Sequence, residues 1–135
     1  MTRSTRFGLL IGVPAALTAG ALMVPHPAAG ALKAGSCFHE SDIGNWHAPD
    51  GKTIYLRVFA SRYYRIDLSR ECAPLRWPQA HLITTVHGSD LICTPVDLDL
   101  KASEGPGAIP EPCFVSSITA LSSGEAALLP KNVKP

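Results

Sequence analysis

The sequence predicts a small, mainly β domain that is held together by disulfides. Apolar and polar residues alternate through 53–59 and again through 64–68, which is typical of half-buried strands. Turn-forming residues separate such runs at short intervals, and four cysteines follow an N-terminal stretch that resembles an export signal. We therefore expect an antiparallel sandwich or partly open barrel of about five to six strands, with one short helix near each end.

Residues 1–31 have the organisation of a signal peptide. Arginines precede an uncharged, mostly apolar stretch over 8–24, and Ala29-Gly30-Ala31 supplies the small residues that signal peptidase requires. We expect cleavage after Ala31, which leaves a single secreted domain over 32–135. The expected location is therefore outside the cytosol, in the periplasm or the medium.

Two other fates of the leader stay open. The apolar stretch is long enough to remain as a membrane anchor, although Pro14, Pro25 and Pro27 disfavour an uninterrupted spanning helix. A lipid on Cys37 is the second alternative, because the segment 34–37 faintly resembles a lipoprotein cleavage box, but this use leaves three cysteines. We expect neither fate, and so no stable transmembrane segment and no lipid anchor in the mature protein.

The cysteines are Cys37, Cys72, Cys93 and Cys113, an even number in a chain that we expect to be exported. This combination predicts disulfides and an oxidising compartment. Of the three possible pairings we prefer Cys37–Cys72 with Cys93–Cys113, and each bridge would contribute about 3 to 4 kcal/mol. A zinc site is disfavoured, because the spacings contain no C-x-x-C pair, and we expect no bound metal and no cofactor.

The first hairpin is the clearest element of the pattern. In the run 53–59 the aliphatic residues Ile54, Leu56 and Val58 share one face, and the run 64–68 continues the alternation after a short break.

Four further strands are expected downstream. A second hairpin should join 81–87 to 90–94 through a tight turn at Gly88-Ser89. Residues 96–100 then alternate as a fifth strand, and the last strand should run over 113–119.

The remaining segments predict a loop and two short helices. Proline and glycine make 103–112 an exposed loop rather than a helix or a paired strand. Ser122 and Glu125 have capping-box spacing, so a short helix should begin there and stop by Pro130. Near the start of the domain, the apolar residues in 38–46 indicate one or two helical turns.

A set of landmarks spans nearly the whole mature chain: Cys37, Ile43, Trp46, Thr53–Leu56, Tyr64–Leu68, Cys72, Leu91–Cys93, Asp97, Cys113–Val115, Ile118 and Glu125. These landmarks resemble a family of small secreted or lipid-anchored proteins of Gram-negative bacteria, which carries only the label domain of unknown function. The resemblance implies the fold and the exported location. It implies no catalytic residue, and the lipid-accepting cysteine that many members carry directly after the signal is missing here.

Composition and motifs argue against several functions. Of the 12 basic residues two lie in the leader, so ten face eleven acids in the mature domain, and no single-sign field favours nucleic acid. His39 and Glu40 lack the second histidine of an H-E-x-x-H motif, since position 43 is isoleucine. Asp97 and Asp99 alternate as the acids of any solvent-facing strand do. We therefore expect no catalytic residues and no enzyme activity.

The first hairpin offers the best candidate binding surface. Tyr55, Arg57, Phe59, Tyr63 and Arg65 place aromatic rings and guanidinium groups on the face opposite the aliphatic set. Such a face can stack on sugar rings or bind phosphate and carboxylate groups.

The alternative for this surface is structural. The same residues would form the second face of a covered sheet, beneath the segment around Trp46 or Trp77, with the arginines paired to Asp67 or Glu71.

These observations favour a non-catalytic module, monomeric, that binds an envelope protein or polymer of unknown identity. A second hypothesis is an inhibitor of an exported hydrolase that presents the stiff loop over 104–112 to the enzyme.

Overall fold

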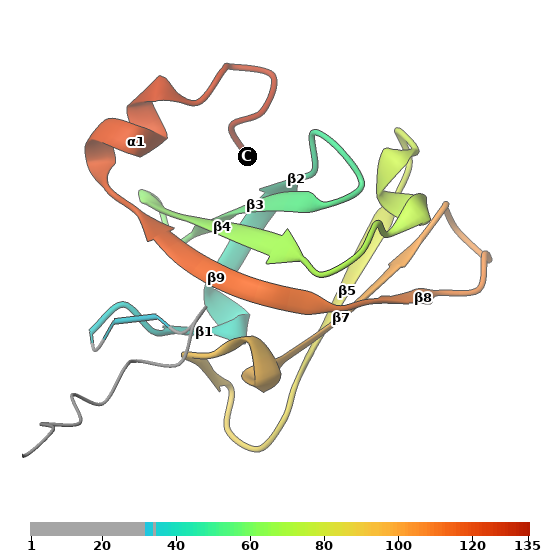
Figure 1. Ribbon diagram of the computed structural model, residues 1–135, viewed down its shortest axis with the longest axis horizontal. Helices are drawn as coiled ribbons and strands as arrows, with labels where there is room; N and C mark the ends of the chain where they lie inside the picture. Colours follow the sequence, from blue (N-terminus) through green and yellow to red (C-terminus); the bar gives the residue numbers. More distant parts are fainter. Residues whose placement is uncertain (1–31, 34) are drawn as a thin grey trace, which may run out of the picture.

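Three antiparallel sheets form the domain (Figure 1), and the computed structural model describes residues 32, 33 and 35–135 of the chain. The predicted signal peptide over 1–31 lies outside these residues. The strands and the helix are β1 (Phe38–His39), β2 (Ile43–His47), β3 (Thr53–Val58), β4 (Arg62–Leu68), β5 (His81–Val86), β6 (Leu91–Ile92), β7 (Leu98–Ser103), β8 (Glu111–Cys113), β9 (Val115–Leu121) and α1 (Ser123–Leu128). Short 3₁₀ turns cover Glu40–Asp42, Ala73–Arg76 and Pro95–Asp97.

The first hairpin, β3–β4, lies at the centre of a four-stranded sheet with the order β2-β3-β4-β9. Its alternation follows the prediction, because the even-numbered residues of both strands, apart from Arg62 at the start of β4, face the core and are buried. The inward set is Ile54, Leu56, Val58, Tyr64, Ile66 and Leu68. A mainly β fold with this hairpin in its core is thus confirmed.

The second sheet has the order β5-β7-β8, and it corrects the predicted second hairpin. β5 pairs along its whole length with β7, while β6 pairs with β1 instead. β7 offers six consecutive residues with an alternating apolar face, whereas β6 has only two. β7 therefore pairs with β5 in the place where the sequence predicted residues 90–94.

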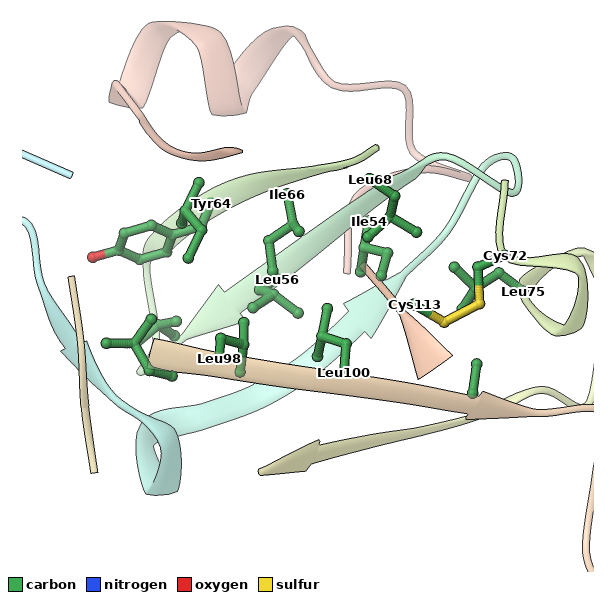
Figure 2. Packing of buried hydrophobic residues seen from close by; sticks show 14 of the residues in the cluster. Ile54, Leu56, Tyr64, Ile66, Leu68, Cys72, Leu75, Leu98, Leu100 and Cys113 are labelled. Carbon is green, nitrogen blue, oxygen red and sulfur yellow. A yellow bond between two sulfur atoms is a disulfide. The ribbon is translucent and has the colours of Figure 1, made fainter. Parts of the chain in front are cut away.

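The two main sheets enclose one hydrophobic core (Figure 2). Leu98 and Leu100 on β7 point toward Leu56 and Ile54 on β3. Only Phe114 separates β8 from β9, so one nearly continuous segment runs from the three-stranded sheet into the four-stranded one. In the described part of the chain the sheets do not close into a barrel.

The sequence predicted the secondary structure at the C-terminal end of the domain better than that at its N-terminal end. Residues 43–47 form strand β2 rather than the expected helical turn, and only the 3₁₀ turn Glu40–Asp42 is helical there. Pairing with β3 decides this, and a register shift between Ile43 and Asn45 turns both Ile43 and Trp46 toward the core. At the other end α1 begins as predicted, with a complete capping box between Ser122 and Glu125.

All four cysteines form disulfides, but the pairing that we preferred is wrong. The structure joins Cys37 to Cys93 and Cys72 to Cys113, with Cα–Cα distances of 4.6 and 5.4 Å. Strand pairing explains the result: β1 lies against β6, which brings Cys37 beside Cys93. The choice of sequence neighbours ignored these contacts between distant strands.

The loop between β7 and β8 spans 104–110, since Ser103 ends β7 and Glu111 begins β8. Pro112 therefore belongs to a paired edge strand, where proline is tolerated, and not to the predicted loop. The last strand is displaced by two residues from its predicted range of 113–119.

Two further observations bear on location. Paired cysteines are typical of an oxidising extracytoplasmic compartment. Among the described residues no helix has the length and apolarity to cross a membrane.

Candidate functional site

The outer face of the four-stranded sheet carries four of the five residues that the sequence singled out for binding. The register aligns two rows of side chains across the strands: Asn45, Arg57, Tyr63 and Leu121 in one, and His47, Tyr55, Arg65 and Thr119 in the next. We call these eight residues the outer face. They are half-buried or exposed, in contrast with the buried side chains of the opposite face.

Phe59 does not belong to the outer face. β3 ends at Val58, and Phe59 occupies the turn to β4 with a φ of 51°, in the left-handed region. Its ring is 58 % exposed, and its backbone N–H donates to the carbonyl of Asp42. The alternation that placed Phe59 beside Arg57 stops one residue earlier than the sequence indicated.

The two arginines of the outer face differ in their partners. Arg65 donates through Nε to Asp67 Oδ1 at 2.8 Å and forms an ion pair with the same carboxylate. This hydrogen bond raises the pKa of Arg65 above its ordinary value. The structural alternative expected Asp67 or Glu71 as the partner of the arginines, and Arg65 pairs with Asp67.

Arg57 has no such partner. Within the described residues no carboxylate lies within 4.0 Å of its guanidinium group, and its Nε is buried without a hydrogen-bond acceptor. A buried donor without an acceptor costs about 1 to 3 kcal/mol.

Neither tryptophan covers the outer face. Trp46 packs against the core from the inner side of β2, and Trp77 lies after the turn Ala73–Arg76 and is 52 % exposed. The C-terminal tail approaches instead, because Lys134 Nζ lies 4.9 Å from the ring centre of Tyr63. This contact adds a cation to the face, and no pattern in the sequence indicated it.

His47 and Asn45 also join the outer face, and the sequence analysis missed both of them. They lie on β2, which we expected to be helical, so their register with Tyr55 and Arg57 could not be anticipated. Ile43 and Trp46 lie three residues apart, and the register shift between Ile43 and Asn45 that turns both toward the core leaves no period-two signal in the sequence.

The candidate acids serve the structure. Asp97 accepts hydrogen bonds from the backbone of Cys93 and Thr94 and from the Thr94 hydroxyl, which lowers the pKa of its carboxyl. Asp99 lies 3.8 Å from Lys101 Nζ in an exposed pair. Among the described residues no three histidine, cysteine, aspartate or glutamate side chains gather as metal ligands.

No family model, curated protein sequence or solved structure matches this chain. The function must therefore be argued from its own residues.

Proposed function

We propose that the protein is a non-catalytic, exported binding module that holds an anionic polymer of the cell envelope on its outer face. Arg57 carries the proposal: within the described residues no carboxylate lies within 4.0 Å of its guanidinium group, and its half-buried side chain belongs to the outer face. Phosphate and carboxylate groups fit the planar guanidinium fork.

The aromatic neighbours of Arg57 support a polymer as the ligand. Tyr63 lies opposite Arg57 on β4, and Tyr55 lies opposite Arg65 in the next row. Half-exposed rings beside cations allow a sugar unit to stack while its acidic group binds the arginine. The chemistry of the site is one of recognition, since every cysteine is bridged and the candidate acid Asp97 caps a turn.

Retention on isolated envelope fractions tests the proposal. The double variant Arg57→Ala/Arg65→Ala should be retained about tenfold less than the natural protein, because the charge-assisted hydrogen bonds to the anion are lost. The matched control is Arg70→Ala/Arg76→Ala, which removes the same charge from exposed positions outside the outer face. Equal retention of both double variants would refute the proposal, and thermal unfolding reports whether each one is folded.

An inhibitor of an exported hydrolase is the second candidate. The loop over 104–110 presents Ile109, which is 87 % exposed, in a segment that Pro106 and Pro110 stiffen. A preorganised loop of this kind loses little entropy when it enters an active site. Deletion of 105–110 should abolish inhibition of a panel of periplasmic and secreted hydrolases, whereas unchanged inhibition, or none by the intact protein, dismisses this function.

A further inference from the structure

The free edge of β9 is a second candidate binding site, separate from the outer face. We propose that it binds an extended, acidic peptide segment by strand addition, in the groove that runs along this edge. β9 is the last strand of the four-stranded sheet and borders it on one side (Figure 1). The proposal rests on backbone direction, groove shape and charge, and not on the binding proposed for Arg57.

Hydrogen bonds at the end of β4 identify which backbone groups of β9 are free. Leu68 N–H donates to Lys52 on the β3 side, while Ser69 N–H donates to Phe114 on the β9 side. In an antiparallel ladder this direction alternates from residue to residue, so Asp67, Arg65 and Tyr63 direct their backbone groups toward β9.

The partners of those residues on β9 are Ser117, Thr119 and Leu121, which therefore turn their backbone groups toward β4. Ile118 and Ala120, between them, direct their N–H and C=O groups away from the sheet. In the described part of the chain neither residue makes a backbone hydrogen bond beyond the strand ladder. Two donors and two acceptors are thus available at strand spacing.

The composition of β9 leaves this edge open. The strand Val115–Leu121 contains no charged residue and no proline, the devices that proteins commonly use to protect an edge strand from pairing. β8, at the border of the other sheet, carries Glu111 and Pro112.

A groove lies along the free edge and ends in a second hollow at the end of β9. The hollow along the edge, of about 390 Å³, lies against 117–120. The second, of about 300 Å³, lies where the end of β9 meets the start of β4 over 61–64, and Ser36 and Ala120 line both. The opposite wall consists of Leu32, Lys33 and Ser36 in the first hollow and of Gly35 and Ser36 in the second.

That wall is fixed in place by its own contacts. Leu32 N–H donates to the carbonyl of Cys93, and the Tyr64 hydroxyl donates to the carbonyl of Ser36. The disulfide between Cys37 and Cys93 ties the same segment to β6. The groove is therefore formed before a ligand enters, and a strand of about five residues, roughly 17 Å long, matches the edge from 117 to 121.

Charge defines the chemistry of the peptide. Lys33 lines the hollow along the free edge, and Arg62 lines the second hollow, where its guanidinium group also donates to the carbonyls of Ser36 and Cys37. Neither hollow is lined by an acidic side chain. Among the described residues no carboxylate lies within 4.0 Å of either cation. An extended segment with glutamate or aspartate side chains complements both the edge and its walls.

Amide exchange measured by NMR on the natively produced, oxidised protein tests this inference. The probe is the peptide acetyl-Thr-Val-Glu-Val-Glu-Val-Thr-amide, and the control is the same peptide with lysine in place of glutamate. At saturation the glutamate peptide should slow exchange at Ile118 and Ala120 by about tenfold or more, because both amides become hydrogen bonded. The lysine peptide should bind at least about tenfold more weakly.

Two further reagents separate strand addition from loose contact. Ala120→Pro removes an edge N–H but no bond to β4, and it should weaken the peptide about tenfold, whereas Ala120→Ser should bind within about twofold of the natural protein. Methylating the peptide nitrogens either at the valines or at the glutamates and threonines should abolish binding for only one of the two sets, since a strand pairs through one edge.

Several results would overturn the inference: unchanged exchange at Ile118 and Ala120, equal binding of the lysine peptide, or equal binding of both methylated peptides. Protection that appears with rising protein concentration and no peptide would assign the edge to a second copy of the chain instead. The variant Arg57→Ala/Arg65→Ala should still bind the peptide, so this test and that of the outer face fail separately.

Discussion

The two faces of the β3–β4 hairpin differ in burial and in chemistry, although the same two strands build both. On the inner face six side chains are between 0 and 6 % exposed and pack against β7. On the outer face Tyr55, Arg57, Tyr63 and Arg65 are half-buried or exposed. Of the two faces of the hairpin only the inner one contributes to the hydrophobic core, so the outer face can keep polar groups that contribute little to folding.

This division predicts which property, stability or binding, each mutation in the hairpin should change. Changes on the inner face should affect the free energy of unfolding, and changes on the outer face should affect binding. A variant that violates this pattern would break the comparison directly.

The largest effect is expected on the inner face. Ile66→Ala should lower the free energy of unfolding by about 2 to 5 kcal/mol, because the side chain is fully buried and its removal leaves a cavity. Chemical denaturation monitored by tryptophan fluorescence measures the change. A loss below about 1 kcal/mol would mean that this face is not the core.

The disulfide at the end of the core should follow closely. Cys72 and Cys113 are buried, and their bond closes a sequence separation of 41 residues. Replacing both by alanine should therefore cost about 3 to 4 kcal/mol, measured by the shift in the denaturation midpoint. If the double variant unfolds at the natural midpoint, this bridge does not support the inner face.

Arg57 sharpens the comparison, because stability and binding should move in opposite directions. Arg57→Met keeps the length of the side chain and removes the Nε donor that lacks an acceptor, so stability should stay equal or rise by up to about 1 kcal/mol. Envelope retention should fall in the same variant. A clear loss of stability would instead make Arg57 part of the structural framework.

Arg65→Ala should have a smaller effect on stability than any core change. The ion pair with Asp67 is largely solvent-exposed, and such pairs contribute about 0 to 1 kcal/mol. Thermal unfolding at low and high salt checks this value. A loss comparable to that of Ile66→Ala would contradict the division between the two faces.

The smallest effect concerns a polar group that does support the fold. Hydrogen bonds from Cys93 and Thr94 lower the pKa of Asp97 below its ordinary 3.8 in the folded state. Its contribution to stability is therefore complete above that value and is lost as the pH falls through the lowered pKa. Asp97→Asn should flatten this acid-range dependence in denaturation curves recorded from pH 2 to pH 6, and an unchanged dependence would assign it to other groups.

The sequence predicted those parts of the fold that depend on local alternation. The inner residues of β3 and β4 and the capping box of α1 follow from their own neighbours in the chain. Contacts between distant strands were not predictable in this way: β5 pairs with β7, and Cys37 reaches Cys93 through the pairing of β1 with β6.

The same limit applies to the candidate sites. Alternation placed Tyr55, Arg57, Tyr63 and Arg65 on one face, and the register of the sheet confirms that they share it. Lys134 and His47 reach this face through tertiary contacts, and Phe59 leaves it because the strand ends. The groove along β9 needs the segment from Leu32 to Ser36 beside a distant strand, which no local pattern encodes.

Photocrosslinking in the native envelope tests most directly whether the outer face is the binding surface. A benzoylphenylalanine side chain in place of Tyr55 should crosslink to an anionic envelope polymer upon irradiation. The same group in place of Thr85, an exposed residue on β5 in the other sheet, should give no such product. Crosslinks from Thr85 alone, or from neither position, would contradict the account.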